Sequence, residues 1–305
     1  MNSLLDLIVE KNRPLTTKGR VATYIPGLSK SDINHLGICV MDCEGNIFQS
    51  GESDIKFTIQ SVSKPIGFIL AVLDNSLEEV FSKVGMEPTG DPFNSIVRLE
   101  TNKSKGKPYN PLINAGAIQM CSMIKGDTHE ERFERVLNFF RTVSENPTLQ
   151  INDEIYQGEK RTGDRNRSMA YFLKCEGLLQ GEVTDALEIY FKQCSIEVTA
   201  KDLAQIALFL ARDGVLSNGV KVVDSKVCRI AKSLMTTCGM YDGSGEFATK
   251  VGIPSKSGVG GGIMSAVPGK YGIGVFGPSL DEKGNSIAGI QVLTDLSENF
   301  DLSIF

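Results

Sequence analysis

Alternating apolar positions near both ends of the chain predict β-strands. Leu36, Ile38 and Val40 alternate with other residues, and a turn sequence follows. Near the other end, short apolar runs occupy residues 262–264 and 270–276 and are again followed by a turn sequence. A period of two residues is typical of strands. The pattern therefore predicts that strands form both early and late in the chain.

Between these regions the apolar residues recur every three or four positions, which is the spacing of helices. Helical spacing is found over residues 65–77, 130–143 and 224–237, and at the chain ends over 1–13 and 287–296. Thr199 and Asp202 have the spacing of a capping box, which predicts the start of a further helix. The middle of the chain is therefore expected to be helical.

This order of elements predicts an α/β (α+β) fold. We expect an antiparallel sheet flanked by terminal helices, with a helical domain inserted between the strands. The sheet domain is expected at residues 1–70 and 225–305, and the helical domain at 71–224. The cleft between the two domains is the expected site, because ligand pockets favour domain interfaces.

Composition excludes several classes of function. The chain has 305 residues, 41% of them hydrophobic, which is enough for a sizeable core. A net charge of −5 gives no electrostatic footprint for nucleic acid, and no apolar run reaches the roughly 18 residues that span a bilayer. Asp6 and Glu10 interrupt the first leucines, so we expect an amphipathic helix there, not a secretory signal, and a cytoplasmic protein.

Cysteine and histidine usage narrows the chemistry further. None of the seven cysteines forms a C-x-x-C pair, so we expect no disulfide framework and no metal site, and most cysteines should be small core residues. The two histidines, His35 and His129, lie in no metal-binding frame and are expected at the surface. A nucleophilic serine would therefore need a lysine or tyrosine as its base.

Ser61 and Lys64 form an S-x-x-K pattern at a predicted helix start. Residues three apart on a helix share one face, and a lysine with a lowered pKa can take the proton of a serine. Ser-Lys pairs serve acyl-transfer enzymes in this way. Taken alone, the pattern fits equally well a serine helix cap beside a solvated lysine. Ser63, two positions from Ser61, is expected to point elsewhere.

A glycine-rich stretch from Lys256 to Gly262 is the second signal. A K-[S/T]-G strand beside an S-x-x-K helix occurs in penicillin-recognising serine enzymes. The glycines would let substrate lie against backbone and would leave an N–H, that of Val259, directed at it. A hairpin turn is the alternative. A phosphate-binding loop is disfavoured, because the lysine precedes the glycines.

Polar residues in tight settings complete the candidates. Asn110 and Asn114 lie beside small residues at a predicted helix start, and residues 159–166 carry five formal charges. On charge alone the second segment would be a solvated loop. Tyr190 and Tyr241 are equally compatible with half-buried packing and with catalysis, and the stretch around Tyr241 is expected to be flexible.

Together these segments resemble the serine-dependent glutaminase family. The matching blocks, in order, are residues 60–65, 108–117, 163–166, 194–199 and 256–262. The resemblance covers nearly the whole chain. It implies a β-lactamase-like fold and hydrolysis of L-glutamine to L-glutamate and ammonia through a γ-glutamyl-serine ester. It also implies no cofactor, no nucleic-acid or membrane partner, and a homodimer or homotetramer.

The resemblance also assigns roles by position. It implies Ser61 as nucleophile, Lys64 as its general base and Tyr241 as an aid to proton transfer. The backbone N–H groups of Ser61 and Val259 would form the oxyanion hole. The residues that would bind the substrate are Gln60, Ser61, Asn114, Glu159, Asn166, Tyr190, Tyr241 and Val259.

Two other functions remain as alternatives. One is a β-lactamase or peptidoglycan peptidase of the same fold, which the expected cytoplasmic location disfavours and which turnover of a chromogenic β-lactam would reveal. The other is a non-catalytic amino-acid-binding protein, which the set of Ser61, Lys64 and Tyr241 disfavours because binding alone needs no activated serine.

Overall fold

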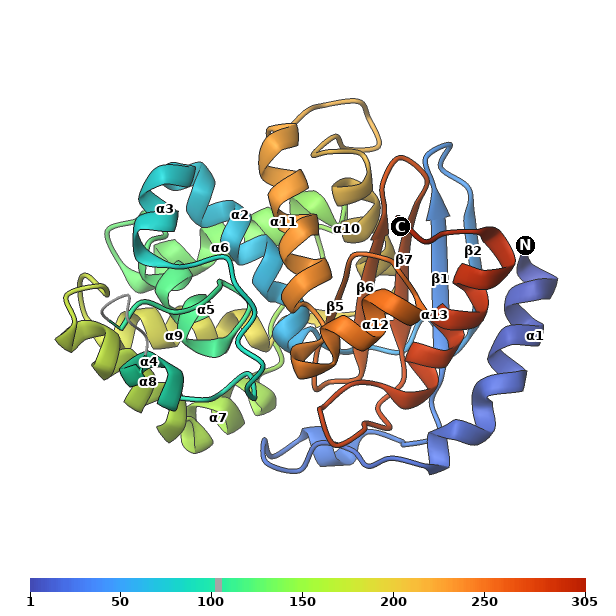
Figure 1. Cartoon of the computed structure of the whole chain (residues 1–305), viewed down its shortest axis with the longest axis horizontal. Helices are drawn as coiled ribbons and strands as arrows, with labels where there is room; N and C mark the ends of the chain where they lie inside the picture. Colours follow the sequence, from blue (N-terminus) through green and yellow to red (C-terminus); the bar gives the residue numbers. More distant parts are fainter. Residues whose placement is uncertain (102–105) are drawn as a thin grey trace.

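The computed structural model describes residues 1–101 and 106–305. Its helices are α1 (Asn2–Asn12), α2 (Lys64–Asp74), α3 (Leu77–Lys83), α4 (Val97–Thr101), α5 (Asn114–Ser122), α6 (His129–Val143), α7 (Asp153–Thr162), α8 (Asp164–Cys175), α9 (Val183–Cys194), α10 (Ala200–Ala211), α11 (Ser225–Cys238), α12 (Ser244–Lys250) and α13 (Ile287–Phe300). Its strands are β1 (Gly37–Asp42), β2 (Ile47–Gly51), β3 (Phe57–Thr58), β4 (Glu197–Val198), β5 (Ser255–Ser257), β6 (Gly262–Val267) and β7 (Tyr271–Phe276). In Figure 1 the sheet and the helices of the middle of the chain lie side by side.

The main sheet joins the two ends of the chain, as predicted. Its strand order is β2-β1-β7-β6-β5, and every neighbouring pair is antiparallel. The early strand β1 pairs with the late strand β7, with Gly37 opposite Phe276. A separate short ladder joins β3 to β4. The predicted antiparallel sheet with terminal helices is confirmed.

Each face of the sheet is covered by helices. In β1, Ile38 and Val40 join the core under the terminal helices α1 and α13, whereas Cys39 and Met41 join the larger core on the opposite face. Helix α10 packs on that opposite face against β7. The approach depends on glycine, because a Cβ at Gly274 would lie 2.0 Å from the Ala200 carbonyl oxygen. The period-two pattern of the sequence thus matches a sheet buried on both faces.

The helical part of the chain packs around α2, whose residues are nearly all buried. Helices α5 and α6 lie against α2, and α9 lies against α5 and α6. The predicted helix at 65–77 ends early, because Asn75 leaves helical geometry and Ser76 caps the next helix through the Glu79 N–H. The proposed division at residues 71 and 225 stays a prediction.

The expectation for the charged stretch is corrected, and that for most cysteines is confirmed. The charged stretch at 159–166 is not a loop: it lies at the junction of α7 and α8, which meet at Gly163. At this junction α7 carries Glu159 into the interior of the protein. Five of the seven cysteines are buried, as expected for most of them, and Cys175 is exposed.

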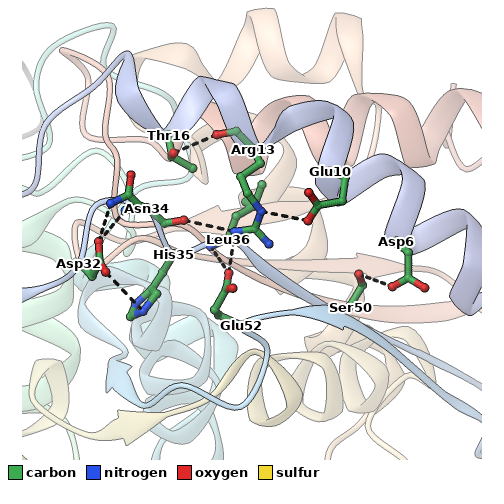
Figure 2. Close-up of polar contacts among 10 residues, drawn as sticks. All are labelled: Asp6, Glu10, Arg13, Thr16, Asp32, Asn34, His35, Leu36, Ser50 and Glu52. Atoms are coloured by element: carbon green, nitrogen blue, oxygen red, sulfur yellow. Dashed lines mark hydrogen bonds and ion pairs between the residues drawn. The ribbon is translucent and has the colours of Figure 1, made fainter.

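A polar network fixes the segment that precedes β1 (Figure 2). Glu52 Oε2 accepts hydrogen bonds from Arg13 Nη1 and from the Leu36 backbone N–H, each at 2.9 Å. Arg13 Nε also donates to Glu10 at 3.0 Å. His35 is partly exposed beside Asp32, in line with its expected surface position. The network ties the end of α1 to the end of β2.

None of the helices within residues 1–101 and 106–305 combines the length and the apolar character needed to cross a membrane.

Candidate active site

Ser61 lies in a tight turn that connects the short ladder to α2. The chain leaves β3, forms a 3₁₀ turn over Gln60–Ser63, and continues directly into α2 at Lys64. Gln60 has φ +49°, a left-handed conformation that is uncommon for residues other than glycine. Such strained residues concentrate at functional sites. Ser61 itself is buried.

Lys64 is fully buried one helical turn from Ser61, and its Nζ donates a 2.6 Å hydrogen bond to Asn114 Oδ1. Burial lowers the pKa of Lys64 to about 8, although the Cys194 thiol and Glu159 act in the opposite direction. Among the described residues, the amino group is hydrogen-bonded to Asn114 and not to Ser61. The helix-cap alternative is wrong in one respect, because this lysine is not solvated.

The segment ahead of α5 explains how Asn114 reaches Lys64. Asn110 Oδ1 accepts hydrogen bonds from the backbone N–H groups of Leu112 and Ile113, at 2.9 and 3.1 Å. A Cβ at Gly116 would lie 2.0 Å from the Asn110 carbonyl oxygen, so only glycine fits there. Asn114 is the first residue of α5, as predicted. Its Nδ2 donates to Asn166 Oδ1 at 3.0 Å, so Lys64, Asn114 and Asn166 form a chain.

Tyr241 is buried, in contrast to the flexible stretch expected around it, and has a left-handed φ of +54°. Its ring centroid lies 4.6 Å from that of Phe93 and 4.3 Å from Lys256 Nζ. Burial raises the pKa of Tyr241, and the Ser61 hydroxyl and the Val259 N–H lower it in part. No described residue makes a hydrogen bond of standard geometry with the Tyr241 hydroxyl.

Strand β5 brings the lysine-serine-glycine segment against the Ser61 turn, as predicted. A Cβ at Gly258 would lie 2.9 Å from the Ile59 carbonyl oxygen and 3.3 Å from the Ser61 nitrogen. The absence of a side chain therefore allows the two backbones to touch. Lys256 is fully buried, and its Nζ donates to the Gly239 and Ser257 carbonyl oxygens at 2.9 and 2.6 Å.

Helices α7 and α9 supply the opposite wall. Glu159 on α7 is only 6% exposed. Burial raises the pKa of Glu159 to about 7, while Lys64 and a hydrogen bond from the Gln60 side chain lower it. Tyr190 on α9 is also buried, and burial raises the pKa of its phenol well above the ordinary value.

These walls enclose a cavity of about 90 Å³. The predicted site residues that line it are Gln60, Ser61, Asn114, Glu159, Asn166, Tyr190 and Val259. Lys64 and Tyr241 do not line it. They lie directly behind its wall, Lys64 against Asn114 and Tyr241 against Phe93. The structure thus brings together all the residues that the sequence selected.

Other residues line the same cavity and were not predicted, among them Tyr24, Phe93, Arg165 and Cys194. Tyr24 lies in a segment without apolar periodicity, so no pattern marked it. Tyr24 as a whole is 54% exposed, yet burial around its hydroxyl raises the pKa of the phenol well above normal. The ring therefore reaches inward from the surface. Arg165 lies in the matching block at residues 163–166, where sequence alone does not distinguish it from Asn166.

A larger cavity of about 580 Å³ lies between α12 and α13, but none of the predicted site residues lines it. The chemistry therefore points to the smaller one. In the part of the chain that the structure describes, no three His, Cys, Asp or Glu side chains gather in a way that could hold a metal ion.

Comparison with known proteins gives concordant matches. The family model described as Glutaminase matches residues 19–305. The glutaminase of Fusobacterium nucleatum is 60% identical over 305 residues, covering 100% of both chains. Glutaminase 2 of Clostridium perfringens is 56% identical over 306 residues, also covering 100% of both.

Solved structures agree with these sequence matches. A probable glutaminase from Bacillus subtilis matches with a TM-score of 0.93 at 40% identity, covering 100% of this chain and 97% of that chain. A Bacillus subtilis glutaminase in covalent complex with 5-oxo-L-norleucine, formed by reaction with 6-diazo-5-oxo-L-norleucine, matches with a TM-score of 0.91 at 38% identity, covering 100% and 99%. The resemblance seen in the sequence and its β-lactamase-like α+β fold are confirmed.

Proposed function

Because the chain belongs to the glutaminase family, we propose that it hydrolyses L-glutamine to L-glutamate and ammonia through a γ-glutamyl ester on Ser61. One observation carries the mechanistic part of this proposal. A fully buried lysine, with its pKa lowered to about 8, lies one helical turn from a serine that lines the cavity. Such a lysine is neutral often enough near neutral pH to accept the proton of a serine.

The polar residues of the wall fit a free amino acid. Glutamine carries an α-ammonium and an α-carboxylate, and each needs a partner when it leaves water. In the proposed complex, ionised Glu159 binds the ammonium. Asn166 and the Tyr190 hydroxyl bind the α-carboxylate, at the polar end of the substrate. Asn114 lies between these residues and Lys64. The side-chain amide then lies over Ser61.

Acylation begins when Ser61 Oγ attacks the amide carbon and its proton passes to Lys64. The oxyanion that forms is held by the backbone N–H groups of Ser61 and Val259, each worth about 3 kcal/mol in such sites. The C–N bond then breaks. Ammonia leaves with a proton returned from Lys64, directly or through the Tyr241 hydroxyl, and the γ-glutamyl ester remains on Ser61.

Deacylation repeats these steps with water. Lys64 takes a proton from water as its oxygen attacks the ester carbon, the same N–H groups hold the second oxyanion, and Ser61 leaves as the alcohol with its proton restored. The new γ-carboxylic acid gives up its proton to water, and glutamate is released with this carboxylate away from Glu159. The cycle consumes one water and needs no cofactor.

Ammonia release from L-glutamine by the wild type and by Ser61→Ala tests this mechanism. We expect turnover by the wild type and a loss of at least about 10³-fold in kcat for the variant. Ser297→Ala is a matched control, because Ser297 Oγ is buried and donates to the Val251 carbonyl at 2.7 Å, on the far helix α13. Equal rates for the wild type and Ser61→Ala would exclude Ser61 as nucleophile.

Covalent labelling identifies the nucleophile without turnover. Incubation with 6-diazo-5-oxo-L-norleucine, followed by peptide mass spectrometry, should place the adduct on Ser61 and leave Ser61→Ala unlabelled.

Asparagine and a chromogenic β-lactam serve as comparison substrates. Robust β-lactam hydrolysis in the absence of glutamine turnover would replace the proposed function with that of a β-lactamase.

Two further expectations, on location and on oligomeric state, belong to the same proposal. The protein would act in the cytoplasm, and it would do so as a homodimer or homotetramer. Light scattering of the eluting chromatographic peak measures the second, and the mass of a single 33.1 kDa chain would refute it.

A further inference from the structure

The strained residue next to Ser61 must be held in place by its surroundings. Gln60 immediately precedes the nucleophile and has φ +49°. A glutamine has no intrinsic preference for this conformation, so the surrounding structure has to impose it. Gln60 is only 2% exposed, which means that buried groups supply the restraint.

Ser63 supplies the first of these groups. Its Oγ donates a 2.7 Å hydrogen bond to the Gln60 carbonyl oxygen, and the Ser63 side chain is fully buried. That carbonyl belongs to the peptide bond that joins Gln60 to Ser61. The bond therefore fixes the orientation of the peptide plane on which Ser61 sits.

Gln193 supplies the second group. Its Nε2 donates to Ser63 Oγ at 3.1 Å, and the residue is 1% exposed. Space for its amide comes from Gly67 on α2, where a Cβ would lie 3.0 Å from Gln193 Oε1 and 3.1 Å from Nε2. Donation from Gln193 occupies an Oγ lone pair and directs the hydroxyl hydrogen toward Gln60.

The same helix that carries Gln193 also forms part of the cavity wall. Tyr190 and Cys194 of α9 line the cavity, whereas Gln193 and Ser63 do not. Gln193 therefore connects the substrate wall to the underside of the Ser61 turn. Its contact with Ser63 needs no substrate.

We infer that Ser63 and Gln193 are positioning residues for the hydrolysis: through the Gln60 carbonyl they hold Ser61 in the orientation required for attack. This inference rests on the proposed function. The Gln60 side chain itself lines the cavity, and its Nε2 donates to Thr58 Oγ1 at 3.2 Å. Ser63, which the sequence set aside as a residue that points elsewhere, thus supports the reaction from behind.

Ser63→Ala and Gln193→Met test the pair. Each variant should lower kcat/KM for glutamine by about 10- to 100-fold, mostly through kcat, because a displaced nucleophile loses attack geometry more than binding. The rate of Ser61 labelling by 6-diazo-5-oxo-L-norleucine should fall in parallel. The double variant should lose no more than Ser63→Ala alone, since both residues act through one carbonyl.

Matched controls separate positioning from a general loss of buried hydrogen bonds. Ser297→Ala removes a buried hydroxyl with the same 2.7 Å bond to a backbone carbonyl. Gln119→Met removes a buried amide whose Nε2 donates to Ser122 Oγ and the Leu178 carbonyl, at 3.3 and 3.1 Å. Both controls should shift Tm by as much as the test variants while retaining wild-type kcat/KM.

The outcomes distinguish the two proposals. Unchanged kcat and labelling in Ser63→Ala, or equal losses in the controls, would overturn the role of the pair while leaving the proposed function intact. A wild type that releases no ammonia from glutamine would overturn the proposed function. In that case deuterium uptake of the peptide spanning residues 57–66 decides on the pair: it must rise in Ser63→Ala and Gln193→Met, and an unchanged uptake refutes it.

Discussion

Lys64 and Glu159 are both removed from water, and burial disfavours the charge on each of them. The pKa of the amine falls to about 8 and that of the carboxyl rises to about 7. Each group partly opposes the shift of the other, because opposite charges attract. The two groups therefore titrate as a coupled pair, with a lysine base and a carboxylate anion both available slightly above neutral pH.

This pair predicts the pH dependence of the reaction. In the proposed mechanism Lys64 acts as the neutral amine, so kcat/KM should rise about tenfold per pH unit and level off above about pH 8. Below about pH 7, protonation of Glu159 should steepen the fall. Steady-state kinetics from pH 5.5 to 9.5 measure the profile. A profile that is flat across this range would contradict Lys64 as the base.

Replacing the buried carboxylate should affect binding above all. Glu159→Gln keeps the volume and removes the charge proposed to bind the substrate ammonium. A hydrogen-bonded charge pair of this kind is worth about 2–5 kcal/mol, so kcat/KM should fall by at least about 30-fold, with KM raised. Glu154→Gln, at an exposed position on the same helix, is the control. A change in kcat alone would contradict ammonium binding.

The residues of the site differ in how far sequence could reveal them. Ser61, Lys64 and Asn114 lie in short motifs with local structure, so spacing along the chain placed them on one face or at a helix start. Tyr24 lies in an irregular segment, and only the folded chain brings its hydroxyl to the cavity. The buried state of Glu159 was also hidden, because its charged neighbours face solvent.

Among elements, glycine decides how closely helices approach the sheet. A Cβ at Gly272 would lie 2.1 Å from the Ala204 carbonyl oxygen, and one at Gly274 would lie 2.0 Å from that of Ala200. Gly245 on α12 has a helical backbone and no atom within 4 Å of such a Cβ. Substitution of a glycine in the sheet and of a glycine in α12 should therefore have opposite consequences.

Gly274→Ala should force α10 away from β7 and lower the free energy of unfolding by at least about 3 kcal/mol, since overpacking costs about 1–3 kcal/mol even where relaxation is possible. Gly245→Ala should raise it by about 0.4–1 kcal/mol, because alanine restricts the unfolded chain and suits a helix. Urea unfolding of both variants measures the difference. A tolerated Gly274→Ala would show that α10 can shift without cost.

Element prediction succeeded where periodicity and caps coincide. The capping box at Thr199 starts α10 as expected, and α11 lies within one residue of the helix predicted at 224–237, with Asp224 as its N-cap. The end of α2 was missed because Asn75 and Ser76 stop one helix and cap the next without breaking the apolar spacing. The short ladder of β3 and β4 has only two residues on each side, too few for any periodic signal.

At the scale of the whole molecule, the two ends of the chain are joined by a buried carboxylate. Asp295 on α13 accepts hydrogen bonds from Asn12 Nδ2 at 2.7 Å and from Lys11 Nζ at 3.0 Å. Burial alone would raise the pKa of Asp295, but hydrogen bonds from Asn12, Lys11 and Gln291 outweigh it and lower the pKa. The N-terminal helix is thereby fixed to the C-terminal helix over the sheet (Figure 1).

Asp295→Asn should lower the free energy of unfolding by about 1–3 kcal/mol at pH 7, because charged hydrogen bonds are lost. A carboxyl with a lowered folded pKa contributes stability above its unfolded pKa of about 3.9, and that stability is lost as pH falls. The difference between variant and wild type should therefore shrink below about pH 4. Exposed Glu298→Gln on the same helix is the control, and an equal effect there would contradict the prediction.

The pairing of β1 with β7 also governs the order in which the protein can be completed during synthesis. Ser61 and Lys64 emerge from the ribosome early. The last fifth of the chain, which emerges last, contains β5, β6, β7 and the Val259 N–H. Until then one edge of β1 has no partner, and contacts this distant in sequence form slowly. Under the proposed mechanism, a nascent chain would therefore carry its serine and lysine long before the Val259 N–H could complete the oxyanion hole, and would gain catalytic activity only as the final strands are added.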